Sequence, residues 1–462
     1  MTGYATEQQV SPRWIAPLCI LTGLVLLAVC CFEWKGVLGI VGIMAFALIT
    51  WHVPEFWIAL LFSSGIFKEW ATLSIPLFRA VDFTVALSAL AALAGFLHWV
   101  RQPRGMGFAH WASLLTFAAL ASYLLLSVSW SPAPKYGLSK ALSFAGFGGV
   151  LFLTTSALGH PKAVLRSLWI LFALAVGTSI YTLVTLVRSV GNLPKILEFY
   201  RASFLGVNPI SYAQWAGAVA VASLAIAPVV RTRWRRVLAY LGSAILVIVV
   251  LAANSRGPML CLVLTVAVLV LAEARRSRSY RALAWMTGAV IVFLLAISLL
   301  PKQLVSRYSD FSEERGGFYA VGSRLTVYQR LRAWESAVDV SLAEPTTMAF
   351  GLGCGGFAHA YYHADVQWWP HNIFLEVLSE GGIVGLLLLA GHWGTFLLLG
   401  RRRGAGIRPT DESRRRIYLA LGLALLFLFI GAQFSGDLSH NRRLWYFLGL
   451  LNAANSEAER SE

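Results

Sequence analysis

The stretch WWPHNIFLEVLSEGG, residues 368–382, gathers side chains that could transfer a proton and bind an anion. His371 is suited to accept a proton near neutral pH, because an unperturbed imidazole titrates close to pH 6.5. Asn372, Glu376 and Glu380 recur every fourth residue, so on a helix they line one face. The first turn of such a helix also offers unpaired N–H groups to a phosphate.

The same residues have a structural interpretation. Pro370, His371 and Asn372 are a common way to begin a helix, and carboxylates in its first turns favour the positive end of the helix dipole. Both interpretations stay open on this stretch alone.

A second motif, NSRGP at residues 254–258, places an arginine at a tight hairpin between two apolar stretches. Gly257 and Pro258 account for the turn, since proline suits the first position of a helix. Arg256 is not needed for the turn. It either reaches from hydrocarbon to water, as long basic side chains do, or binds an anionic ligand.

A third motif, RLRAW at residues 330–334, has Arg330 and Trp334 one helical turn apart on the same face. Arg332 points to another face, and Arg324 lies shortly before the motif. The structural alternative is a solvated run of charge.

A fourth motif, SHNRRLW at residues 439–445, follows Asp437 and contains His440, Arg442 and Arg443. These residues either serve the site or anchor the last apolar segment. The pattern favours anchoring.

The elements that must position these residues are membrane helices. Hydrophobic residues make up 58% of the 462-residue chain, including 17 Trp and 27 Phe, and the mean hydropathy is +0.67. This exceeds what a soluble globular protein buries. Apolar stretches recur along the chain, and about 20 such residues cross ~30 Å of hydrocarbon. The sequence therefore predicts an all-α polytopic membrane protein with about 12 to 14 transmembrane helices.

The first of these spans is expected to be retained, because no small-residue cleavage site precedes the next span. The predicted spans lie near residues 13–31, 36–50, 53–67, 76–99, 108–129, 139–158, 164–187, 209–230, 237–253, 257–273, 282–300, 373–400, 416–433 and 440–453.

Basic clusters at residues 231–236, 275–281 and 401–416 predict the orientation, because cytoplasmic loops collect Lys and Arg. Two predicted spans separate each cluster from the next, so all three fall on the cytoplasmic side. Residues 301–370 then form one large helical loop on the other side, and both termini are expected in the cytoplasm. The net charge of +16 belongs mostly to the inner face, where anionic membrane lipids attract it, so nucleic acid is not an expected partner.

This topology divides the chain into four parts. They are residues 1–300 with the first eleven spans, 301–370 as the loop domain, 371–453 with the C-terminal spans, and 454–462 as a cytoplasmic tail.

Within the loop, apolar spacing predicts a helix over Thr326–Leu342 that ends before Pro345. The GLGCGGFAHAYYH that follows is too rich in glycine for a helix, and we interpret it as a turn held close to another element.

The run from Ile373 to Gly400 would rise ~42 Å as one helix, which is longer than ~30 Å of hydrocarbon. Its apolar part from Ile383 already rises ~27 Å. The HNIFLEVLSEGG portion is therefore expected at the outer headgroup level, where a lipid phosphate would meet it.

Five cysteines are scattered through the chain and imply no disulfide framework. No CxxC or HExxH spacing suggests zinc, and the outer face shows no tight DxD pair for a cation. The sequence predicts neither a metal nor a cofactor.

Taken in order, SRGP at a hairpin, R-x-x-x-W in the large loop, GLGCGGF and PHNIFLEVLSEGGIVG resemble the bacterial O-antigen ligase and polymerase superfamily. The resemblance covers about residues 205–450, and the HN-x-x-L-E-x-x-x-E-x-G-x-x-G stretch is its most specific part. It implies a metal-independent glycosyltransferase of the bacterial inner membrane with its active site facing the periplasm. The donor would be a glycan on undecaprenyl diphosphate, and the acceptor lipid A core.

The resemblance also implies functional residues. The histidine of the HN motif matches His371, and the two arginines match Arg256 and Arg330, with Arg324 as a competing match for the second. Physical chemistry agrees, because arginines can meet the charge that grows on a departing diphosphate and a histidine can accept the acceptor's proton. The expected substrate-binding residues are Asn372, Arg324, Arg332, Glu376 and Arg442.

Three other functions remain open. A polymerase and a protein O-oligosaccharyltransferase would use the same donor, and the sequence does not separate them from a ligase. A polysaccharide transporter is the non-enzymatic alternative, but transporters commonly contain internal repeats, and none is found here. His392 is the main polar residue within a span, and we expect it to pack against Trp393.

Overall fold

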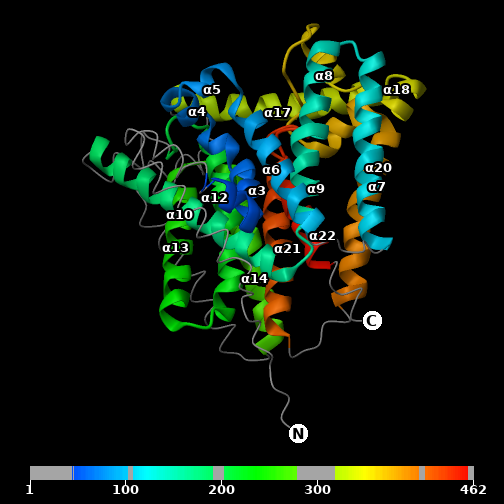
Figure 1. Cartoon of the computed structure of the whole chain (residues 1–462). Helices are drawn as coiled ribbons and strands as arrows, with labels where there is room; N and C mark the ends of the chain where they lie inside the picture. Colours follow the sequence, from blue (N-terminus) through cyan, green and yellow to red (C-terminus); the bar gives the residue numbers. More distant parts are fainter. Residues whose placement is uncertain are drawn as a thin grey trace, which may run out of the picture.

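The computed structural model of the chain describes Met44 and residues 46–101, 108–190, 202–277, 318–404 and 411–455. In these residues the protein is a bundle of α-helices without a strand (Figure 1). Nine of their helical segments are long and apolar enough to cross a membrane, so the chain is a multi-pass membrane protein, as predicted. The predicted spans 13–31 and 282–300, and most of 36–50, lie outside the described residues.

The long helices are α6 (Phe83–Arg101), α7 (Phe108–Ser127), α10 (Pro161–Val190), α12 (Pro209–Ile226), α13 (Arg233–Ala252), α14 (Arg256–Ser277), α17 (Phe318–Leu342), α20 (Ile373–Gly404) and α21 (Glu412–Ala432). Two pieces, α8 (Pro134–Ser143) and α9 (Gly149–Ala157), form one further span through a π-helical turn at Phe144–Gly148. The shorter helices are α3 (Pro54–Phe62), α4 (Ser64–Ser74), α5 (Leu77–Ala80), α18 (Pro345–Phe350), α19 (Gly356–Tyr362) and α22 (Arg443–Asn455).

The bundle has two chemically different ends. We call the end that carries α17, α18 and α19 the loop end, and the opposite end the basic end (Figure 1). At the basic end, Arg416 of α21 pairs with Glu273 of α14 at 2.5 Å, and Arg276 of α14 pairs with Glu412 of α21 at 2.7 Å. The described parts of the three basic clusters therefore lie at one end, as their spacing predicts.

Three predicted spans differ in their bounds or continuity from the helices of the structure. The span predicted at 53–67 is two helices, α3 and α4, that meet at Ser63. The span predicted at 76–99 begins later, because the carboxylate of Asp82 accepts hydrogen bonds from the backbone N–H of Thr84 and caps α6. The last predicted span, 440–453, is the 13-residue α22, which rises only ~20 Å.

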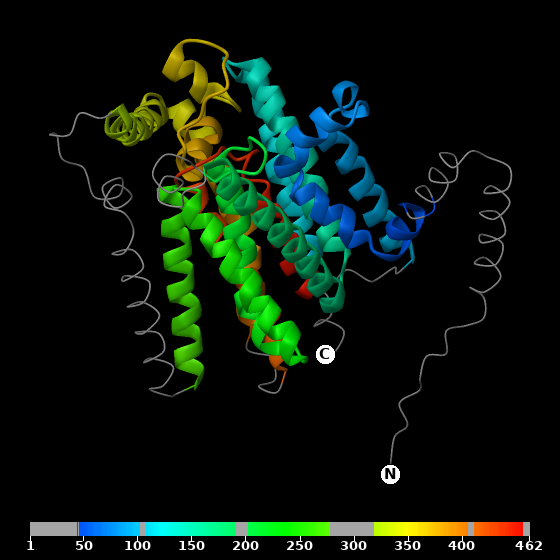
Figure 2. The same cartoon turned by 90° about the vertical axis from the view of Figure 1, so that its left-hand side faces the viewer.

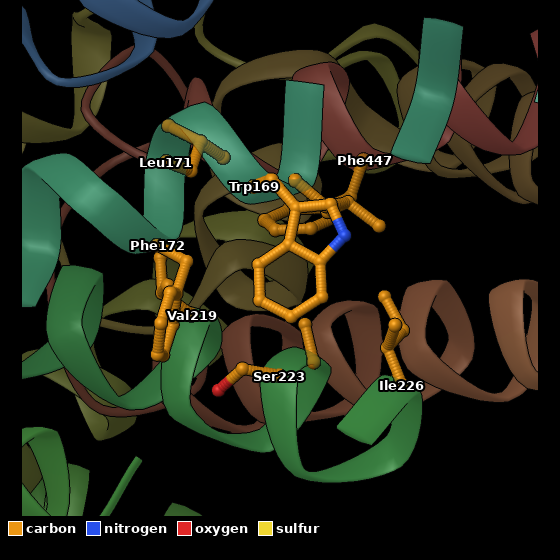
Figure 3. A pocket seen from close by; sticks show the side chains of 9 residues that line it. Trp169, Leu171, Phe172, Val219, Ser223, Ile226 and Phe447 are labelled. Atoms are coloured by element: carbon orange, nitrogen blue, oxygen red, sulfur yellow. The ribbon is translucent and has the colours of Figure 1, made fainter. Parts of the chain in front are cut away.

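Helix α12 occupies the centre of the bundle because it has no polar face. Its sequence PISYAQWAGAVAVASLAI is apolar or small on all sides, as buried helices are. Tyr212 and Trp215 are fully buried in it, and Gly217 packs against the ring of Phe427 of α21. A narrow apolar crevice remains beside it, between Trp169 and Phe172 of α10 on one side and Val219, Ser223 and Ile226 of α12 on the other (Figure 3).

His392 lies in the core, but not against Trp393 as the sequence led us to expect. Its fully buried ring contacts four aromatic side chains from three other segments and its own helix, namely Phe117, Phe152, Phe396 and Trp445. Nδ1 of His392 lies 3.0 Å from Oγ1 of Thr116. Trp393 packs instead on Phe374 and Phe429, because consecutive residues of a helix point in directions about 100° apart.

Helix α17 lies across the loop end, roughly perpendicular to the long helices (Figure 1), and Figure 2 shows it nearly end-on. It contains the helix predicted over Thr326–Leu342 and begins earlier, at Phe318. Its buried Ala333 and Ala337 pack on Phe357 of α19 in a small apolar cluster that also includes Tyr361, Trp368 and Leu375. This cluster fixes α17 above the start of α20.

Candidate functional site

The histidine of the HN motif stands immediately before α20 in a strained backbone conformation. His371 has φ +59°, a left-handed conformation that non-glycine residues seldom adopt. Asn372 follows as the cap of α20, since its Oδ1 accepts hydrogen bonds from the N–H of Phe374 at 3.0 Å and Leu375 at 3.1 Å. The structure thus gives Asn372 a capping role.

The imidazole of His371 lies among aromatic rings and beside one cation. Its ring centroid is 5.4 Å from that of Trp368 and 5.3 Å from that of Trp369. Burial first and the neighbouring charge of Arg330 second lower the pKa of His371 to about 4, while Asp437 acts in the opposite direction. The ring is therefore neutral at pH 7, and two of the three predicted catalytic residues, His371 and Arg330, are brought together.

Arg330 is half-buried on α17 and makes no ion pair with any residue that the structure describes. Burial lowers its pKa, because a guanidinium loses hydration there. Arg332, two residues later, is exposed, and its Nε donates a hydrogen bond to the hydroxyl of Tyr328 at 2.8 Å. The two arginines thus differ in exposure, and of the two only Arg330 is close enough to His371 to affect its pKa.

The two carboxylates of the HN stretch do share one helical face, and that face is buried. Nζ of Lys140, from α8, lies 2.5 Å from Oε1 of Glu376 and 2.7 Å from Oε2 of Glu380. Glu376 also accepts a hydrogen bond at 3.0 Å from the N–H of Leu438. Glu376 thus connects α8, α20 and the segment before α22. Its side chain is buried in the helix bundle, with 1% of its surface exposed.

The glycine-rich loop before the HN motif is held against α20, as we interpreted it. Helix α20 kinks at Gly382, whose φ of 63° and ψ of −163° are nearly restricted to glycine. The kink leaves the carbonyls of Ser379 and Glu380 without helical donors, and the N–H groups of Leu352 and Gly353 bond them at 2.9 Å each. The interpretation was wrong in one respect, because α19 forms within the stretch at Gly356–Tyr362.

A second imidazole also contacts Trp369. The ring of His440 stacks on Trp369 with centroids 5.4 Å apart. Its Nδ1 is 2.7 Å from Oδ1 of Asp437, and the hydroxyl of Tyr136 donates to Oδ2 of Asp437 at 3.0 Å. Burial opposes ionisation of Asp437, but the hydrogen bonds from His440 and the charge of Lys140 hold its pKa below the usual value.

The loop that carries His371 is tied to the start of α8. The carboxylate of Asp365 accepts hydrogen bonds from the N–H of Lys135 at 2.9 Å and of Tyr136 at 3.0 Å. These are free donors of the first helical turn, where a negative charge is favourable. Asp365 therefore sets the distance between the HN motif and the helix that supplies Lys140.

Arg256 begins α14 at the loop end, because α14 and α21 are antiparallel and their opposite ends pair at the basic end. It therefore lies at the same end of the bundle as His371. The other predicted residues are dispersed. Arg442 donates to the hydroxyl of Ser64 at 3.0 Å and lies over the ring of Phe147, in agreement with an anchoring role. Arg324 lies in α17, but its side chain is outside the described part.

Sequence reasoning missed Lys140, Tyr136 and Asp365. The signal for Lys140 was a charged residue inside an apolar span, because such residues are costly unless they are paired. Tyr136 and Asp365 carry no local signal of their roles. Where the structure describes the chain, no three His, Cys, Asp or Glu side chains are placed to hold a metal ion, and Cys261 and Cys354 are free thiols.

Comparison with known proteins indicates a family. Residues 241–390 match the family model described as O-antigen ligase. An O-antigen ligase of Pseudomonas aeruginosa is 27% identical over 358 residues, which cover 73% of this chain and 75% of that protein. The family match includes Arg256, Arg330 and His371. The two findings confirm the resemblance to the O-antigen ligase superfamily.

Proposed function

We propose that this chain, as a member of the O-antigen ligase superfamily, transfers a glycan from undecaprenyl diphosphate to a hydroxyl of lipid A core at the periplasmic face of the inner membrane. One observation carries the proposal. A half-buried arginine, Arg330, lies near a neutral histidine, His371, at the loop end, and no carboxylate of the described chain pairs with that arginine. A desolvated cation without a partner is costly, so the arrangement is explained by an anionic ligand.

The donor's diphosphate supplies such an anion. Breaking the bond between the anomeric carbon and the diphosphate adds negative charge to the departing oxygen. Cations lower the activation barrier most when they are already positioned where that charge develops. A guanidinium can donate two parallel hydrogen bonds to a phosphate. Arg330 and Arg256 are the two cations that we assign to this task.

His371 meets the substrate as an uncharged ring. It can accept the proton of the acceptor hydroxyl or hold that hydroxyl in line with the anomeric carbon. Its low pKa arises from burial and from Arg330, so a bound diphosphate, which offsets the charge of Arg330, makes the imidazole more basic. Base strength then rises when the donor is in place.

The walls around His371 suit a sugar. Trp368 and Trp369 present flat apolar rings beside it. The indole nitrogens of Trp368 and Trp369 are buried and, within the described chain, have no acceptor. Buried donors usually have partners, so these two N–H groups are candidates to bond glycan hydroxyls or ring oxygens.

The acceptor distinguishes a ligase from related transferases. A polymerase or a protein O-oligosaccharyltransferase would use the same cations and the same donor. The name of the Pseudomonas aeruginosa relative favours ligation. We therefore propose lipid A core as the acceptor, with a second carrier-linked repeat unit or a protein as the outcomes that would redirect the assignment.

The test is transfer by the purified protein in lipid nanodiscs, supplied with a glycan on undecaprenyl diphosphate and with lipid A core. We expect transfer without any gradient or nucleotide, and losses of at least about 100-fold in Arg330→Ala, Arg256→Ala and His371→Ala, since single groups of this kind contribute about 10²–10³-fold. Arg79→Ala is the matched control, because Arg79 is an exposed arginine of α5 at the same end. Full activity of all three variants would overturn the proposal. Movement of the glycan lipid across the membrane without bond transfer would indicate a transporter.

A further inference from the structure

We propose that His440, held by Asp437, is a second catalytic imidazole and the group that takes the proton from the acceptor hydroxyl. The inference rests on the proposed function and deepens it. It assigns proton removal to a residue that the sequence pattern favoured as an anchor, and it leaves His371 to orient the substrate beside Arg330.

The geometry around His440 is that of an imidazole fixed by a carboxylate. Oδ1 of Asp437 accepts hydrogen bonds from Nδ1 of His440 at 2.7 Å, from the backbone N–H of His440 at 2.6 Å and from the hydroxyl of Ser439 at 2.8 Å. Oδ2 accepts from the hydroxyl of Tyr136 at 3.0 Å. Both oxygens of a fully buried carboxylate are thus fixed, and one of them is aimed at the ring.

This contact determines which ring nitrogen can act. When Nδ1–H donates to a carboxylate, the neutral imidazole carries its lone pair on Nε2. The side chain of His440 is 53% exposed, whereas that of Asp437 is 0% exposed, so the basic nitrogen is accessible and its partner is not. A carboxylate in this position also stabilises the imidazolium that forms when the ring accepts a proton.

His371 lacks these advantages. The positive charge of Arg330 opposes its protonation, and no carboxylate lies within hydrogen-bond distance of its ring in the described chain. A base is most effective when its pKa lies near the working pH, so a ring with a pKa of about 4 is a weak acceptor until the donor binds. His371 is better suited to hold a hydrogen bond than to remove the proton.

The two imidazoles contact the same indole ring. Trp369 is stacked on His440 with centroids 5.4 Å apart and an interplanar angle of 28°, and it meets His371 edge-on at 5.3 Å and 62°. The segment that carries His440 is held against α20 and α8. The N–H of Leu438 donates a hydrogen bond to the carboxylate of Glu376, which in turn pairs with Lys140. The buried ion pair therefore holds the second imidazole in place.

The chemical step balances without another reactant. The acceptor oxygen forms a bond to the anomeric carbon while its proton moves to Nε2 of His440. The bond between the anomeric carbon and the diphosphate oxygen breaks, and its electron pair leaves with undecaprenyl diphosphate. The proton on His440 then passes to water or to the released diphosphate, which restores the neutral ring.

The test compares His440→Ala and His440→Gln with the wild-type protein in the transfer assay. We expect kcat to fall by about 10²–10⁴-fold, the range of general base catalysis, while the KM for the donor changes by less than about threefold. Added imidazole is expected to restore part of the activity of His440→Ala, where the ring leaves a space, and none in His440→Gln. His363→Asn is the matched control, because His363 is an exposed loop histidine whose left-handed φ asparagine accepts.

Asp437 acts through His440 and is a positioning residue. Asp437→Asn should lower kcat without changing the KM for the donor, and a thermal melt shows whether the variant is folded. If it is not, the rescue of His440→Ala by imidazole decides the question alone. Wild-type transfer together with full activity of His440→Ala would overturn this inference and leave the proposed function intact. No transfer by the wild-type protein would overturn both.

Discussion

Lys140 of α8 and Glu380 of α20, 240 residues apart in the chain, form a buried ion pair with Nζ and Oε2 2.7 Å apart. Glu376 shares the same ammonium at 2.5 Å. The pair connects the helix whose first turn is capped by Asp365 to the helix that begins after His371. The candidate site therefore rests on a charged cluster inside the bundle.

Removing the lysine should destabilise the protein strongly. Lys140→Met leaves two buried carboxylates without a cation, and breaking one partner of a buried pair costs about 3–5 kcal/mol. We expect a lower melting temperature in detergent than for Lys135→Met, an exposed lysine of the same helix. Adding Glu376→Gln and Glu380→Gln to Lys140→Met should recover part of the loss. Equal melting temperatures for Lys140→Met and the wild type would show that the cluster does not support the fold.

The pKa of His371 should depend on Arg330. The imidazole titrates at about 4 in the wild-type protein because of burial first and the charge of Arg330 second. Arg330→Gln removes a positive neighbour, which favours the protonated ring, so the pKa of His371 should rise towards 6.5. NMR of histidine-labelled protein in nanodiscs, with His371→Gln to assign the signal, measures it. An unchanged pKa of His371 in Arg330→Gln would show that the charge of Arg330 does not act on the imidazole.

The kink of α20 should tolerate no side chain at its centre. Gly382→Ala places a Cβ against the backbone of Ala349 and Gly351 in a conformation that alanine avoids. We expect a loss of about 1–3 kcal/mol from backbone strain alone and a fall in transfer, because the glycine-rich loop must move. Gly391→Ala, in the same helix with open space around it, is the control. Thermal melts and the transfer assay are carried out with both variants. Equal stability and activity of Gly382→Ala and Gly391→Ala would contradict the role given to the kink.

Transfer should be insensitive to EDTA. Guanidinium groups supply the fixed positive charge in this account, so the leaving diphosphate has no need of a divalent cation. Activity is measured with EDTA in excess over all divalent metal and again after Mg²⁺ is returned. A loss that Mg²⁺ restores would show that the arginines do not suffice.

Local signals in the sequence predicted much of the fold. Spacing of apolar residues predicted the helix at Thr326–Leu342, whereas the kink of α20 at Gly382 was not predicted. Periodicity failed for α3 and α4, because the break at Ser63 depends on packing rather than on a helix-breaking residue.

The site was less predictable than the fold. His371 and Arg330 were identifiable from residue type and motif, and the structure brings them together. Lys140 and Asp365 were not, because each acts on a residue more than 200 positions away. Asp437 and His440 are three residues apart, so the sequence could have predicted their contact. Only the stacking of His440 on Trp369 distinguishes a residue of the site from one that anchors the last helix.

The central claim is that Arg330, beside His371, binds the diphosphate of the lipid carrier. The most direct measurement is the affinity of the protein in nanodiscs for undecaprenyl diphosphate alone, followed by tryptophan fluorescence, since Trp368 and Trp369 adjoin His371. The account predicts that Arg330→Ala weakens binding about 10- to 100-fold, as expected for about 1.5–3 kcal/mol from a charged hydrogen bond, while Arg79→Ala binds as the wild type does. Equal affinity of Arg330→Ala and the wild-type protein would contradict it.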